Sequence, residues 1–168
     1  MRLFAAVMCA FLMICTGNAV RRNMKKRARF LQKLCLFMTL FKPRVQYLHE
    51  PIYKTVKVLS KNSQLSELLF LCQCTTDYEG GTPFPKAWET AVKDIPSYEL
   101  KAEDARLLCS FGESVSSADS HDISAVISLY EAFLCERSQS EQKEAERDGK
   151  MCMSIFSAIG ILLAIIII

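Results

Sequence analysis

Several side chains in this sequence have the chemistry of catalytic or metal-binding groups. Ser120, His121 and Asp122 carry the three groups of a hydrolytic triad. Neighbouring residues on one backbone point apart, however, so these three cannot converge as a triad requires, and we interpret them as a polar helix start. His49 and His121 are the only histidines, too few for a metal site by themselves. The sequence therefore predicts no catalytic residue, no metal, no cofactor and no small-molecule substrate.

The eight cysteines do not indicate a site either. Three lie in the apolar ends of the chain, and the remaining five are an odd number. Cys72 and Cys74 form the only close pair, whereas structural zinc needs a second pair or suitably spaced histidines. For a middle region in the reducing cytoplasm, as argued below, we expect no disulfides and interpret the cysteines as small buried hydrophobic residues.

The ends of the chain are apolar enough to suggest membrane spans. Residues 3–20 and 151–168 carry no charge, and each run has 18 residues. A helix of that length covers roughly 27 Å, close to the ~30 Å hydrocarbon core of a bilayer. We expect an amino-terminal transmembrane helix over 1–20, a middle domain over 21–150 and a carboxy-terminal transmembrane helix over 151–168.

A cluster of basic residues follows the first apolar run. Because positive residues near a span stay cytoplasmic, we expect a cell-membrane protein whose middle domain faces the cytoplasm. The alternative is a signal peptide cleaved after Gly17-Asn18-Ala19, but a basic cluster just behind the cleavage site would oppose translocation. The cluster consists of Arg21, Arg22, Lys25, Lys26, Arg27, Arg29 and Lys33.

Charge divides the middle domain into a basic front half and an acidic back half. Residues 21–61 hold twelve Lys and Arg against one acidic residue, while residues 62–150 hold eight against seventeen. A basic front half attracts anionic lipid headgroups and would also suit nucleic-acid phosphates. It lacks aromatic residues interleaved for base stacking, because Phe30 and Phe37 fall on its apolar face. We therefore expect lipid contact and no nucleic-acid partner.

Helical periodicity dominates the middle domain. Apolar residues recur at helical spacing from Phe84 to Ile95, from Ala105 to Val115 and from Ile123 to Leu134. The sequence predicts an all-α bundle of about six helices, packed as antiparallel pairs. Thr82 is expected to cap one of these helices, and Pro43 to end or kink the first. Trp88 and Phe111, on consecutive stripes, should share one core.

The last charged segment predicts a helix that continues into the carboxy-terminal span. Glu141, Glu144 and Asp148 are spaced three and four residues apart along it. Like charges at this spacing repel, so they do not serve helix stability. One interpretation is a solvated face interleaved with Arg137, Lys143 and Arg147. The other is a docking strip for a basic partner surface.

Several local motifs follow one another in a chain with an apolar run at each end. They are His49-Glu50-Pro51-Ile52, Ala87-Trp88-Glu89 and Leu107-Leu108-x-x-Phe111-Gly112-Glu113. Their order resembles the stage III sporulation protein AB family of endospore-forming bacteria. The resemblance implies a middle domain similar to the cytoplasmic domains of platform proteins in type II secretion and type IV pilus systems.

The same resemblance implies a function. It indicates a non-enzymatic membrane platform in the secretion-like complex that links mother cell and forespore, needed for endospore development. Its location would be the mother-cell membrane around the forespore. Its partners would be other stage III sporulation proteins, including a secretion-type ATPase, and membrane lipids. The alternative from another class is a membrane-tethered basic module that binds anionic lipid or nucleic acid.

Overall fold

The computed structural model describes residues 2–117 and 122–167, with the side chains of 2–14, 21, 149, 150, 152, 153, 156, 157 and 160–167 excepted. Within these residues the chain forms six α-helices and one short 3-10 helix and has no strand, which confirms the predicted all-α class. The helices are α1 (Arg2–Gln46), α2 (Ile52–Ser60), η1 (Ser63–Leu65), α3 (Leu69–Glu79), α4 (Phe84–Lys93), α5 (Ala102–Ser117) and α6 (Ile123–Ile167).

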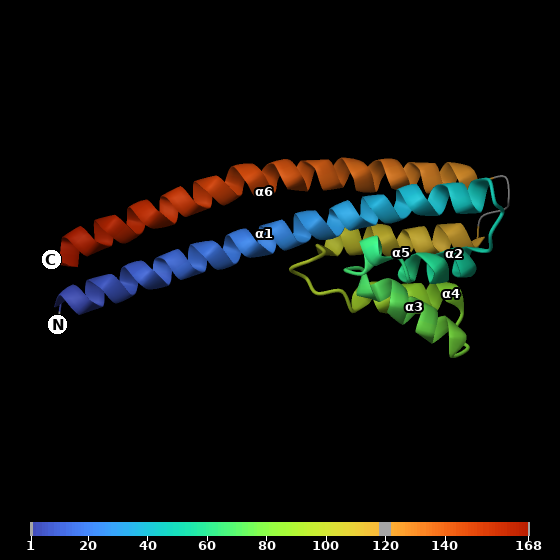
Figure 1. The fold of residues 1–168 in the computed structure, drawn as a ribbon, viewed down its shortest axis with the longest axis horizontal. Helices are drawn as coiled ribbons and strands as arrows, with labels where there is room; N and C mark the ends of the chain where they lie inside the picture. Colours follow the sequence, from blue (N-terminus) through green and yellow to red (C-terminus); the bar gives the residue numbers. More distant parts are fainter. Residues whose placement is uncertain (1, 118–121, 168) are drawn as a thin grey trace.

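Two long helices give the molecule its shape. α1 and α6 are each 45 residues long, which corresponds to about 67 Å at 1.5 Å per residue. They lie side by side and antiparallel, so the start of α1 and the end of α6 lie at the same end of the molecule (Figure 1). Each helix runs without a break across the predicted domain boundary, at residues 20–21 in α1 and 150–151 in α6.

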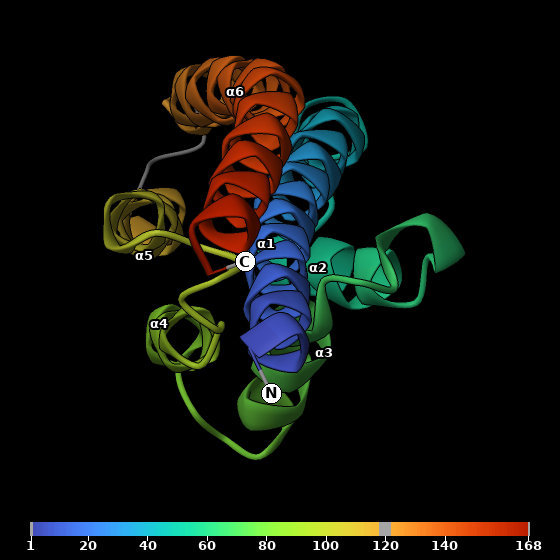
Figure 2. The same cartoon turned by 90° about the vertical axis from the view of Figure 1, so that its left-hand side faces the viewer.

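The four shorter α-helices gather around the other end of this pair. Viewed along the long axis, α1 lies centrally, with α6 on one side and the body formed by α2, α3, α4 and α5 around the rest of its circumference (Figure 2). Successive helices α2, α3, α4 and α5 contact one another in order. Contact between consecutive helices is what short connections favour.

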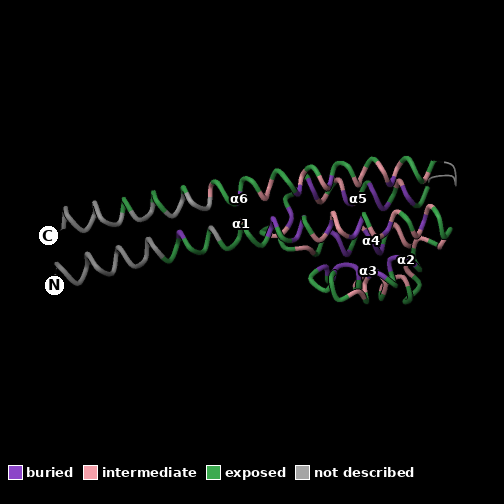
Figure 3. The backbone as a smooth tube through the Cα atoms, turned by 45° about the horizontal axis from the view of Figure 1, so that its top comes forward, coloured by how far each residue is buried: buried purple, intermediate pink, exposed green. Residues whose placement is uncertain are grey.

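The core lies where this body meets α1. Trp88 is fully buried between aromatic rings of three other helices: Phe37 of α1, Phe70 of α3 and Phe111 of α5, with ring centroids 5.4–6.1 Å away. Its indole Nε1 donates a hydrogen bond of 2.7 Å to the Leu108 carbonyl oxygen. The prediction that Trp88 and Phe111 share one core is thus confirmed. Buried residues concentrate at this end of the long pair (Figure 3).

Two local expectations were wrong, one of them in part. Pro43 does not end α1, because the helix continues to Gln46 and Pro43 lies in its last turn; a kink at Pro43 stays a prediction. Its ring costs the helix one hydrogen bond there, while its carbonyl oxygen still accepts from the Tyr47 amide at 2.9 Å. Thr82 does not cap α4, since the helix begins after Pro83, whose extended backbone makes no side-chain cap.

The predicted membrane spans find no support in the fold. Within the described residues, none of the helices combines the length and the apolar character that crossing a bilayer requires. Most of the side chains of 1–20 and 151–168 lie outside the described part of the chain.

Candidate functional site: charged faces of the two long helices

The basic cluster of α1 divides between two faces. Arg22, Lys25, Lys26 and Arg29 are exposed, and Lys33 is half-buried. Lys26 places its Nζ atom 5.2 Å from the centre of the Tyr98 ring, a cation–π contact. The side chain of Arg21 lies outside the described residues.

Arg27 belongs to the opposite face and is buried. One guanidinium nitrogen lies 2.9 Å from Asp104 Oδ2 of α5 and 2.8 Å from Glu141 Oε1 of α6. The three side chains are only 4–12% exposed. Arg27 therefore connects three helices rather than facing lipid or solvent.

Further cations complete this buried ion cluster. Arg137 Nε donates to Asp104 Oδ1 at 3.0 Å, and its terminal nitrogen reaches Glu103 at 2.8 Å. The hydrogen bond to Asp104 is the largest cause that raises the pKa of Arg137 above its usual value. Lys101 lies 3.2 Å from Glu141. Each carboxylate at the centre thus has two cations, which offsets the cost of burying charge.

The three residues of the predicted docking strip lie in different surroundings. Glu141 is committed to Arg27 and Lys101 inside the molecule, so it does not lie on a free face. Glu144 is exposed and Asp148 half-exposed, and within the described residues neither makes an ion pair. A docking role for these two remains a prediction. Sequence spacing alone could not reveal that Glu141 faces α1, since that depends on how the long helices are rotated against each other.

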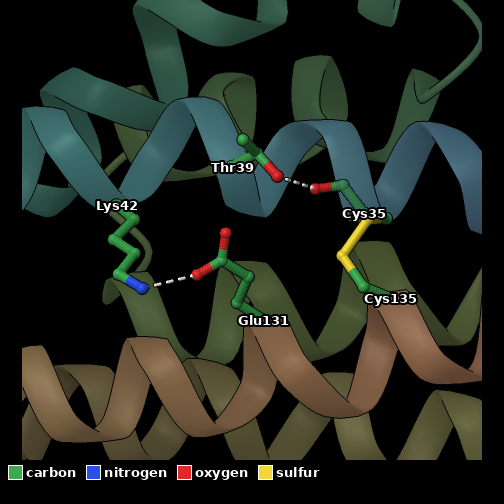
Figure 4. Close-up of a disulfide and its surroundings, with 5 residues drawn as sticks. All are labelled: Cys35, Thr39, Lys42, Glu131 and Cys135. Carbon is green, nitrogen blue, oxygen red and sulfur yellow. Dashed lines mark hydrogen bonds and ion pairs between the residues drawn. A yellow bond between two sulfur atoms is a disulfide. The ribbon is translucent and has the colours of Figure 1, made fainter.

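A disulfide joins the long helices, contrary to the expectation of reduced cysteines. Cys35 of α1 and Cys135 of α6 are bonded through their sulfurs, with Cα atoms 4.9 Å apart (Figure 4). One to two turns away, Lys42 Nζ and Glu131 Oε2 form an ion pair of 2.7 Å between the same helices. The pairing spans 100 residues of sequence, and no spacing rule predicts which helical faces meet over such a distance.

Two of the remaining cysteines, Cys74 and Cys109, have little thiolate character. Cys74 is buried, and desolvation raises the pKa of its thiol to about 12. Desolvation also raises the pKa of Cys109. In the part of the chain that is described, no group of three or more His, Cys, Asp and Glu residues is placed to hold a metal ion. Ser120 and His121, from the apparent triad, lie outside the described residues.

A groove lies beside the exposed cations of α1. One part, about 340 Å³ in volume, runs between α3 and the loop before α5, over Phe30, Phe70 and Tyr98. It continues into a second part of about 290 Å³ that reaches Lys26 and Arg29. The cations of this surface can be identified in the sequence. The apolar groove next to them cannot.

The comparisons with known proteins agree with the motif order in the sequence. Residues 2–168 match the model of the family described as stage III sporulation protein AB. No curated protein and no solved structure matches the chain. Since the family match extends over both long helices and the whole body between them, the chain belongs to the stage III sporulation protein AB family.

Proposed function

We propose that the protein is a non-enzymatic platform in the sporulation complex that connects mother cell and forespore, and that endospore development needs it. Family membership supports a role at stage III of sporulation. The observation that carries the platform role is the architecture: the body of α2–α5 is held at one end of the α1–α6 pair, away from both termini (Figure 1).

Membrane attachment is the second element of the proposal. Residues 3–20 and 151–168 are uncharged, and the antiparallel pairing of α1 and α6 places these runs at the same end of the molecule. Two neighbouring apolar helices at that end would anchor the protein in the mother-cell membrane around the forespore. The basic residues after Val20 favour the cytoplasm for the body.

The use of buried charge supports a scaffold rather than an enzyme. Arg27, Asp104 and Glu141 are largely buried where the long helices meet α5, and Arg27 pairs with both carboxylates across α1, α5 and α6. These interactions fix the body on the helix pair, as a platform that positions partners requires.

The proposed partners are other stage III sporulation proteins, a secretion-type ATPase and membrane lipids. The test is co-purification of the full-length chain, solubilised from membranes of sporulating cells, with the ATPase as the second measured protein. The proposal predicts that the two co-purify and that loss of the chain abolishes spore formation. Absence of the ATPase from the purified complex, or normal sporulation without the chain, would contradict it.

Glu144 and Asp148 allow a sharper version of this test. Both carboxylates are free of ion pairs in the described structure, so Glu144→Lys with Asp148→Lys should leave the fold intact. If they dock a basic surface, the double variant loses at least ten-fold in co-purified ATPase. The matched control reverses Glu136 and Glu146, which are exposed on α6 but off that face. Equal behaviour of both variants and the wild type would leave Glu144 and Asp148 without a docking role.

A further inference from the structure

Five cations form a strip along one face of α1. They occupy positions i, i+3, i+4, i+7 and i+11, which lie on the same side of a helix. Within the described residues none of them takes part in an ion pair, in contrast to Arg27 on the other face. The members of this strip are Arg22, Lys25, Lys26, Arg29 and Lys33.

The strip destabilises α1, so helix stability does not explain why these cations lie together. Like charges three or four residues apart destabilise a helix by a few tenths of a kcal/mol per pair. The strip contains several such pairs, for example Arg22 with Lys26 and Arg29 with Lys33. An anionic surface that covers it would remove this repulsion.

Next to the strip lies the groove described above, and it exposes apolar surface. Leu69 at its edge is 73% exposed and Tyr98 is 46% exposed. Glu67 and Glu99 line the groove as well, and in the described part of the chain neither is ion-paired. The surface therefore combines a row of cations, an apolar floor and two carboxylates.

Lipid headgroups can attract only some of the cations in the strip. This argument rests on the membrane attachment proposed above. α1 advances 1.5 Å per residue, so Lys33 lies roughly 16 Å farther from the membrane than Arg22. Electrostatic attraction is screened within about 8 Å at physiological salt. Headgroups thus reach Arg22, Lys25 and Lys26, while Arg29 and Lys33 extend beyond them.

We propose that the strip and its groove bind an acidic amphipathic helix of a partner protein, lying along α1. Carboxylates on the partner helix pair with Arg29 and Lys33, and an apolar residue covers Leu69 and Tyr98. Glu67, together with Glu99, sets the orientation, because the partner has to present a cation there. Charge complementarity of this kind determines the on-rate and the specificity of the contact.

The test is photo-crosslinking in sporulating cells, with a photoreactive amino acid in place of Leu69 in the full-length chain. We expect an adduct with a protein segment that carries net negative charge and that mass spectrometry identifies by its sequence. Introducing Arg29→Glu and Lys33→Glu should reduce the yield of that adduct at least ten-fold. The matched control, Lys54→Glu with Lys86→Glu, reverses two other exposed cations and should leave the yield unchanged.

Four outcomes of this experiment would overturn the docking proposal. These outcomes are no adduct, an adduct with lipid or nucleic acid, an adduct with a basic segment, and a yield that does not depend on Arg29 and Lys33. The membrane fraction of the same cells separates this proposal from the proposed function. A variant that stays in the membrane while losing the adduct supports the docking site. A wild-type chain outside the membrane fraction refutes the membrane attachment instead.

Discussion

Gly112 gives the most direct test of the core packing, because its place in α5 leaves no room for a side chain. A Cβ atom built there would lie 2.8 Å from Trp88 Cγ and 2.9 Å from Trp88 Nε1. The indole cannot move aside easily, since it is fully buried among the rings of Phe37, Phe70 and Phe111. We therefore expect Gly112→Ala to displace Trp88.

The magnitude follows from three effects. Overpacking a core costs about 1–3 kcal/mol. Displacing Trp88 also weakens its hydrogen bond to the Leu108 carbonyl oxygen, and leaving a buried donor unsatisfied costs roughly 1–3 kcal/mol. Replacing glycine by alanine within a helix stabilises the helix by about 1 kcal/mol. The expected net loss of unfolding free energy is about 1–5 kcal/mol.

The assay is urea denaturation of the detergent-solubilised full chain, followed by circular dichroism and by the fluorescence of its single tryptophan. The Gly112→Ala variant should unfold at lower urea concentration and show red-shifted Trp88 emission. Gly80→Ala is the matched control, because a Cβ atom there would meet its nearest neighbour at an ordinary 3.4 Å. A Gly112→Ala protein as stable as the wild type, with unchanged emission, would refute the packing described around Trp88.

Three further predictions concern the ion cluster and the cysteines. Arg27→Met should lower the unfolding free energy by about 2–3 kcal/mol. This loss is smaller than that caused by a buried carboxylate without any cation, because Asp104 and Glu141 each keep a second cation. An unchanged urea midpoint would contradict this. Cys35→Ser removes a link that closes a 100-residue loop and should cost about 2–4 kcal/mol relative to the oxidised protein, whereas the reduced wild type should match the variant in a thermal melt. The pKa of Cys74 is raised to about 12 from an ordinary value of 9.0, so the thiol keeps its proton to higher pH in the folded state than in the unfolded state. The unfolding free energy should therefore fall as pH rises from about 9 toward 12. In a series of thermal melts at different pH values, Cys74→Ala should remove that part of the decline.

Local patterns in the sequence were sufficient for the body of the fold. The apolar stripes of α4 and α5 predicted both helices and the shared burial of Trp88 and Phe111, since a helix with one apolar face has to bury that face. These inferences needed only contacts between neighbouring segments.

What the sequence did not predict depends on contacts between distant segments. Arg27 and Asp104 are 77 residues apart, and Cys35 and Cys135 are 100 apart. Their meeting is set by the rotation and the register of α1 against α6, which helical periodicity does not define. For the same reason Arg27 was grouped with the exposed cations and Glu141 with the free carboxylates, although they bind each other.

The central claim, a membrane-attached platform with its body in the cytoplasm, is tested most directly at Cys72, which is exposed on α3. Intact sporulating cells are treated with a membrane-impermeant maleimide, and their membranes are then isolated and washed with alkaline carbonate. The account predicts that the full-length chain stays in the washed membranes and that Cys72 is labelled only when the cells are permeabilised first. Release of the chain by carbonate, or labelling of Cys72 in intact cells, would contradict it.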